Sequence, residues 1–185
     1  MVREGRPCQS WSMGWACHFL LVRDGDPAEV AARLGGWLVT QIIDAERATT
    51  RDAPGPAVGP LVNGWLMVTD AHGQLFDDKY GAVLSQGGHV LEFFIEEHVS
   101  FACAVSLRDG ATEWSLTYAD GRLTSTGEVP GIAAEGDEFD APADVIYRLT
   151  GWMYDDEFDD EPFVPVLGLP PPDGGKRRRR RWKPW

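Results

Sequence analysis

The chain has 185 residues, of which 43% are hydrophobic and 25% charged, and its formal net charge is −12. These values fit one domain with a hydrophobic core and exclude wholesale disorder. The charge is unevenly divided, because seven of the last ten residues are Lys or Arg and residues 1–175 therefore sum to −19. A body this acidic repels phosphate, which disfavours nucleic-acid binding by the domain and favours a basic protein partner.

Cysteine usage and hydropathy bear on the compartment. The three cysteines, Cys8, Cys17 and Cys103, are an odd number and form no C-x-x-C pair. This pattern indicates a reducing compartment, so we expect a cytoplasmic protein. The apolar run from Trp15 to Val22 is short and has no small-residue cleavage site after it, so we expect neither a signal peptide nor a membrane span.

The N-terminal part predicts a flexible arm, a strand and a helix. Residues 1–13 are polar and irregular, whereas Trp15 to Val22 is apolar on both faces, as in a central strand covered on two sides. His18 lies in this run and is expected to be a hydrogen-bonded core histidine. Asp26-Pro27-Ala28-Glu29 supplies an N-cap, a proline at the first helical position and a carboxylate three residues after the cap. The helix should end at Gly35-Gly36.

The next stretch predicts two more strands and a second helix. Trp37 to Ile43 is rich in residues that favour strands, and strands one and two could be parallel neighbours. Asp44 to Pro60 reads as a loop, and Leu61 to Thr69 as the third strand. The second helix is expected to be capped by Asp77 or Asp78 and to end at Gly87-Gly88.

The clearest pattern runs from His89 to Thr126, where apolar and polar residues alternate with period two. Arg108-Asp109-Gly110-Ala111 and Asp120-Gly121 interrupt it with residues that accept the positive φ of tight hairpin turns. An antiparallel meander follows, and an amphipathic helix over Pro142 to Met153 should cover one face of it. The predicted fold is therefore α+β, a mostly antiparallel sheet with two or three helices packed on it.

The predicted domain spans residues 14–154. Residues 155–175 read as an acidic and then Pro-rich linker, and residues 176–185 as a disordered basic tail. The linker opens with six carboxylates in seven residues, which we interpret either as a solvated linker or as a patch for a basic partner: Asp155, Asp156, Glu157, Phe158, Asp159, Asp160 and Glu161.

Several segments in order resemble known proteins: Val22 to Val30, Gly64 to Val68, Leu84 to Gly88, and a strand pair with Asp109-Gly110. Together they resemble small uncharacterised bacterial domains of unknown function, some of them suspected toxin-immunity proteins. The resemblance covers roughly residues 15–120. It implies a small binding protein and assigns no catalytic residue.

The sharpest candidate for chemistry is the row Glu92, Glu96 and His98, which an uninterrupted strand would place on one face. At about 3.3 Å per residue, the Cα atoms of Glu92 and Glu96 lie about 13 Å apart, too far to share one ion, whereas Glu96 and His98 lie about 7 Å apart. A solvated strand face remains the alternative interpretation. Cys17 and Cys103 could face each other across the sheet, although buried and inert thiols are the usual case.

The standard motifs for nucleophilic catalysis, nucleotide phosphates and zinc do not occur in the sequence, and we expect no cofactor. The first hypothesis is a small acidic intracellular binding protein without catalysis, of the immunity or inhibitor type, with a basic protein partner. The alternatives are a small hydrolase that uses Glu96 and His98 with groups from Asp70 to Gly73, and a nucleic-acid-associated protein that uses Lys176 to Lys183 of its tail.

Overall fold

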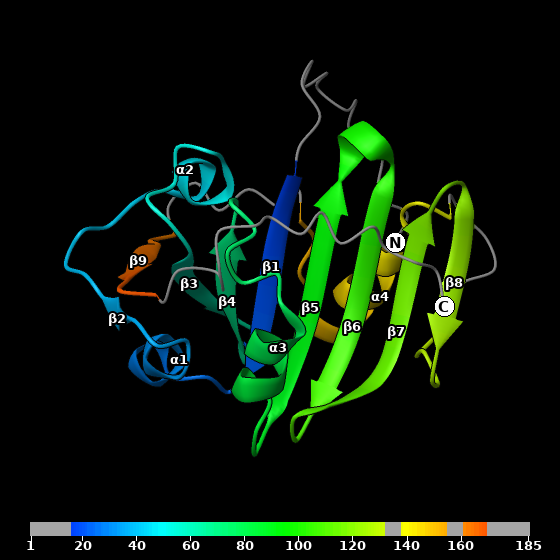
Figure 1. Cartoon of the computed structure of the whole chain (residues 1–185), viewed down its shortest axis with the longest axis horizontal. Coiled ribbons are helices and arrows are strands. Elements are labelled where there is room, and N and C mark those ends of the chain that lie inside the picture. The colour runs from blue at the N-terminus through cyan, green and yellow to red at the C-terminus, as the bar shows by residue number, and fades with distance from the viewer. Residues whose placement is uncertain (1–15, 132–137, 155–160, 170–185) are drawn as a thin grey trace.

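A computed structural model of the chain describes residues 16–131, 138–154 and 161–169. These residues form a nine-stranded antiparallel sheet in the order β2-β9-β3-β4-β1-β5-β6-β7-β8, with four α-helices (Figure 1). The strands are β1 (Ala16–Arg23), β2 (Trp37–Leu38), β3 (Ala57–Val62), β4 (Trp65–Asp70), β5 (His89–Glu96), β6 (Phe101–Arg108), β7 (Ala111–Ala119), β8 (Arg122–Thr126) and β9 (Val164–Leu167). The helices are α1 (Pro27–Arg33), α2 (Ala45–Thr49), α3 (Asp78–Leu84) and α4 (Ala141–Thr150), with a 3-10 turn η1 (Glu97–Val99).

Strand β1 is the centre of the sheet, between β4 and β5, as the apolar run predicted. Its side chains alternate between two cores. Phe19 and Leu21 join the core under α4, and Leu20 and Val22 join the core under α1 and α3. We call these two sides the α4 face and the α1 face; Figure 1 shows α3 on the near side of the sheet and α4 behind it. The predicted α+β class and antiparallel meander are confirmed.

The helix starts follow from the capping residues. The Asp26 carboxylate accepts hydrogen bonds from Ala28 N (3.0 Å) and Glu29 N (2.9 Å), and the Asp77 carboxylate accepts one from Lys79 N (3.2 Å). Both caps were predicted, because a carboxylate at this position satisfies backbone donors that have no partner inside the helix.

Two tryptophans anchor the α4 face. Trp114 and Trp152 are 5% and 1% exposed, so both are buried. Trp152 follows the helix C-cap Gly151 and does not lie on α4 itself. Its ring is 4.8 Å from that of Phe19, so the chain beyond the helix also closes the core.

The predicted loop over Asp44 to Pro60 is wrong, because it contains α2 and most of β3. The predicted single strand over Leu61 to Thr69 is instead part of a hairpin, β3 with β4. The chain reverses at Asn63 (φ 50°) and Gly64 (φ 82°), and Asn-Gly is the pair that a type I′ turn favours. The Asn63-Gly64 pair is therefore a local sequence signal for this hairpin.

Strand β9 corrects the predicted linker over residues 155–175, because it lies between β2 and β3 in the sheet. The backbone N–H of Val166 points to β3, where it donates to Pro56 O. N–H groups alternate in direction along a strand, so the N–H that Pro165 lacks would point toward β2. Strand β2 has only two residues and does not extend to the position opposite Pro165, so no ladder hydrogen bond is lost there. The proline is therefore tolerated inside the sheet.

The second predicted strand, Trp37 to Ile43, is reduced to the two residues of β2 and a single bridge from Ile43 to Phe163. It pairs with β9 and is not a parallel neighbour of β1. The predicted arm, the basic tail and residues 155–160 of the acidic run lie outside the described residues. Within the described ranges, no helix has the length and apolar character that crossing a membrane requires.

Candidate functional site

The predicted row Glu92, Glu96 and His98 does not form. Strand β5 ends at Glu96, and the chain turns into η1, which contains His98, before Ser100 takes a left-handed conformation (φ 48°). The uninterrupted strand on which the row depended is therefore absent. Over residues 16–131, 138–154 and 161–169, no group of three His, Cys, Asp or Glu side chains is placed to hold a metal ion.

The two described cysteines lie on opposite faces of the sheet. Cys17 belongs to the α4-face core, whereas Cys103 is the cross-strand partner of Phe94 and shares the other face with it. Both are buried free thiols. Burial raises the pKa of Cys17 and raises the pKa of Cys103 to about 12, so neither is a nucleophile at neutral pH. The possibility that they face each other across the sheet is therefore wrong, and the expected burial of both thiols is confirmed.

A histidine and an aspartate are buried side by side near one end of the sheet. His18 on β1 pairs in register with Asp70 on β4, and the side chains of both are 1% exposed. His18 Nδ1 lies 3.9 Å from Asp70 Oδ2, too far for a hydrogen bond, and Oδ2 instead accepts one from Leu75 N (2.6 Å). The ring of Phe76 packs edge-on against His18, with the ring centroids 5.3 Å apart.

This pair differs from the predicted hydrogen-bonded core histidine. Both ring nitrogens of His18 and Oδ1 of Asp70 are buried, and none of them has a hydrogen-bond partner in the part of the chain that the structure describes. Each such group costs about 1 to 3 kcal/mol of stability. Although an aspartate beside a histidine resembles part of a catalytic triad, the pair is closed off from solvent and has no nucleophile aligned with it.

A second polar cluster joins strands β5, β6 and β7 at the other end of the sheet. His89 Nε2 and Ser106 Oγ are 2.8 Å apart, and Ser106 Oγ donates to Glu113 Oε2 (2.8 Å). Arg108 Nε donates to Glu113 Oε1 (2.8 Å), and a terminal nitrogen of Arg108 lies 3.2 Å from His89 Nδ1. The four side chains form a closed ring of hydrogen bonds.

Proton positions in this ring exclude serine activation by His89. A guanidinium only donates, so Nδ1 of His89 must accept from Arg108, and the proton of the neutral imidazole is on Nε2. Nε2 then donates to Ser106 and cannot take its proton, which a nucleophilic serine requires. Burial and the Arg108 charge lower the pKa of His89, and the hydrogen bond from Arg108 lowers the pKa of Glu113. The ring ties three strands together and is a structural feature.

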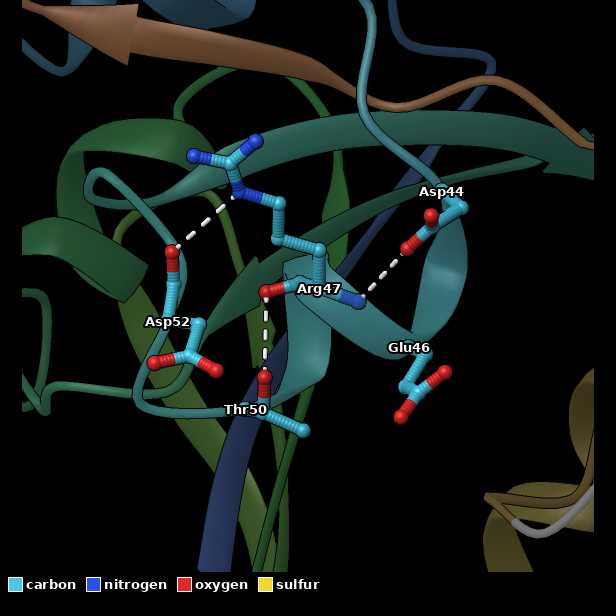
Figure 2. Close-up of a pocket in the computed structure, with 5 residues that line it drawn as sticks. All are labelled: Asp44, Glu46, Arg47, Thr50 and Asp52. Atoms are coloured by element: carbon cyan, nitrogen blue, oxygen red, sulfur yellow. Dashed lines mark hydrogen bonds between the residues drawn. The ribbon is translucent and has the colours of Figure 1, made fainter.

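A shallow hollow of about 460 Å³ lies beside α2 (Figure 2), lined by Asp44, Glu46, Arg47, Thr50 and Asp52. Asp44 caps the helix by accepting from Arg47 N (2.8 Å), and Arg47 Nε donates to the backbone oxygen of Asp52 (3.3 Å). Figure 2 shows the Arg47 guanidinium pointing away from the Glu46 carboxylate. Among the described residues, the carboxylates of Glu46 and Asp52 have no hydrogen bond or ion pair, so they are available to an external cation.

The sheet edge next to this hollow exposes large apolar side chains. Trp37, Ile42 and Leu167 are 59%, 65% and 40% exposed. Trp37 and Leu167 are cross-strand partners, and the indole lies against Gly168 (φ 78°), where an added Cβ would come within 1.9 Å of the ring. Exposed apolar groups of this size, gathered at one edge, are typical of contact surfaces.

The hollow and the Trp37–Leu167 pair lie on the same side of the sheet, whereas Ile42 neighbours Ile43, which is buried in the α4-face core, so Ile42 points away from that face at the same edge. Leu38 packs into the α1-face core, so its neighbour Trp37 points to the α4 face, and Ala48 of α2 is buried in the core of that same face. Four residue steps along the chain lead from Phe163, which forms the bridge to Ile43, to Leu167, which pairs with Trp37, a distance of about 13 Å. We call this surface the edge surface: Trp37, Ile42, Leu167, Asp44, Glu46 and Asp52.

The acidic run that was predicted as a partner patch ends at Glu161, two residues before Phe163. Of its seven residues only Glu161 is described, and it is exposed. Phe163, two residues later, exchanges backbone hydrogen bonds with Ile43 (2.9 and 3.0 Å), next to Asp44. The sequence did not identify the edge surface, because the exposure of Trp37 and Ile42 depends on β9 being their neighbour.

Comparison with known proteins gives no relative: no protein-family model, no curated protein and no solved structure matches this chain. The function of this chain is therefore inferred from the geometry of its described residues.

Proposed function

We propose that this chain is a binding protein without catalysis, of the immunity or inhibitor type, whose basic protein partner docks on the edge surface. One observation supports this above the others. Exposed Trp37, Ile42 and Leu167 lie on the same sheet edge as the carboxylates of Glu46 and Asp52, which have no described counterion. An apolar centre with charged groups at its rim is the usual anatomy of a protein interface.

The net negative charge of the described residues supports a basic protein partner. The described residues hold 20 of the 29 Asp and Glu but only eight of the 17 Lys and Arg, so their net charge is −12. A field of this sign attracts a cationic protein from a distance and repels nucleic acid. We therefore expect the association rate to fall steeply as salt is added.

We expect Trp37 to contribute the largest share of the binding free energy at the edge surface. Tryptophan is enriched among interface residues whose truncation to alanine costs 2 kcal/mol or more. Its indole lies against Gly168 before any partner arrives, and a contact already formed in the free protein reduces the side-chain entropy lost on binding. Glu46 and Asp52 would then set charge specificity at the rim.

The hydrolase alternative needed Glu96 and His98 on one strand, and the chain turns between them. No observation favours it over binding. The nucleic-acid alternative depends on the basic tail, which lies outside the described residues, so it remains a prediction from sequence.

The proposal is tested by site-specific photo-cross-linking in the cells that make the protein. A benzophenone amino acid at Ile42 should cross-link to a protein with net positive charge. The matched control is Val99 on η1, which is 63% exposed and far along the chain from the edge surface. Equal cross-linking from both positions, or an acidic product from Ile42, would contradict the proposal.

A further inference from the structure

We propose that the basic tail, residues 176–185, docks on the edge surface of its own chain and competes there with the partner. The docking is independent of the proposed function, and only the competition rests on it. The surface that fits a basic, aromatic partner fits this tail equally well, and the tail is attached at the same edge.

The attachment point is fixed by the structure. Leu169, the last described residue, packs against the α1-face core, and its side chain lies 3.2 Å from the position that a Cβ on Gly36 would occupy. It follows Leu167 of the edge surface by two residues. The tail therefore leaves the domain at the sheet edge that carries Trp37 and Leu167, on its α1-face side, and would reach the edge surface by passing around that edge.

The reach of the intervening chain is sufficient. Six residues, 170–175, separate Leu169 from Lys176, and at about 3.1 Å per residue they extend to roughly 20 Å. The edge surface is about 13 Å long between the Ile43 and Trp37 pairs. A tether this short holds the tail at an effective concentration on the order of millimolar.

The chemistry of the tail is complementary to the surface. It contains five consecutive arginines, two lysines and two tryptophans. Guanidinium groups pair with carboxylates in two-pronged contacts, which suits Glu46 and Asp52. A tail tryptophan can pack on the exposed indole of Trp37. Arg178 and Trp182 are four residue steps apart, about 13 Å when extended, which matches the spacing between the Ile43 bridge and the Trp37 pair.

The chain offers a direct test, because it has only three lysines: Lys79, Lys176 and Lys183. A carbodiimide joins a lysine amine to a carboxylate that it touches. Lys79 Nζ lies 3.9 Å from Asp77 Oδ2, which makes their cross-link the internal reference. Applied to the full chain at low salt, the reagent should join Lys176 or Lys183 to Asp44, Glu46 or Asp52.

The outcomes separate the proposal from its alternatives. Mixing ¹⁵N-labelled and unlabelled chains should show that the tail cross-links form within one chain, and Trp37→Ala should reduce them at least fivefold without changing the Lys79 reference. Tail cross-links confined to residues 155–161, cross-links only between chains, or none while the reference forms would overturn the docking.

Competition is tested separately, on the full chain with the partner found from Ile42. If the tail binds the edge surface with an intrinsic dissociation constant of about 0.1 mM and its effective concentration is about 1 mM, the docked state is favoured about tenfold. Replacing all five arginines by serine should then tighten partner binding about tenfold. Unchanged affinity would refute competition. Since the carbodiimide experiment contains no partner, its failure leaves the proposed function standing, and failure of the photo-cross-linking leaves the docking standing.

Discussion

Phe163→Ala tests whether residues 161–169 belong to the domain, on which the edge surface depends. Phe163 is fully buried, and its ring occupies the space beside Gly59, where an added Cβ would lie within 2.2 Å of a ring carbon. Truncating a buried phenylalanine removes its transfer free energy and leaves a cavity, so we expect a loss of about 3 to 5 kcal/mol. That is a large share of the 5 to 15 kcal/mol that stabilises a typical domain.

The assay is urea unfolding of the full chain, followed by tryptophan fluorescence and circular dichroism together, with the slope against denaturant unchanged. Leu61→Ala is the control, because Leu61 is 60% exposed on the neighbouring strand and should change stability by less than about 0.5 kcal/mol. A loss below about 1 kcal/mol for Phe163→Ala would refute the reasoning, and β9 would have to be removed from the core.

Three further predictions concern the polar clusters and the tail. His18→Phe should raise the free energy of unfolding by about 1 kcal/mol, because it removes two buried nitrogens without partners; a loss above 1 kcal/mol in urea would show that His18 is bonded after all. Because the pKa of His89 is lowered in the folded state, the unfolded chain takes up a proton at higher pH than the folded chain does, and the free energy of unfolding should fall as the pH drops below about 6.5. His89→Gln should make the free energy of unfolding less dependent on pH between about pH 7 and 5. An unchanged pH dependence would contradict this prediction. Ending the chain at Gly175 should lower the melting temperature by only a few degrees, because tail docking favoured about tenfold stabilises the folded chain by about 1.4 kcal/mol. Anisotropy should show little nucleic-acid binding by the full chain near 0.15 M salt; tight, salt-sensitive binding lost on truncation would favour the nucleic-acid function.

What the sequence predicted well was local. The period-two alternation from His89 to Thr126 gave β5 to β8, and the caps at Asp26 and Asp77 gave the starts of α1 and α3. Each of these signals lies within a few residues of the element that it specifies. The Asn63-Gly64 turn was equally local and was overlooked.

The remaining features depend on partners that are distant in the chain. Strand β9 contains Pro165, and only its position between β2 and β3 shows why a proline is tolerated there. The His18 to Asp70 pair and the ring around Ser106 follow from strand register, which composition does not reveal. The acidic run could be recognised in the sequence, but the pairing of Phe163, two residues after it, with Ile43 could not.

The most direct test of the central claim is the affinity of the partner cross-linked from Ile42 for three purified full-length chains: wild type, Trp37→Ala and Val99→Ala. Both substituted side chains are exposed, at 59% and 63%, so neither change should unfold the domain. A loss of about 2 kcal/mol at an interface centre corresponds to roughly 30-fold in the dissociation constant. The account predicts at least that loss for Trp37→Ala and less than a twofold change for Val99→Ala, whereas equal affinities for all three chains would contradict it.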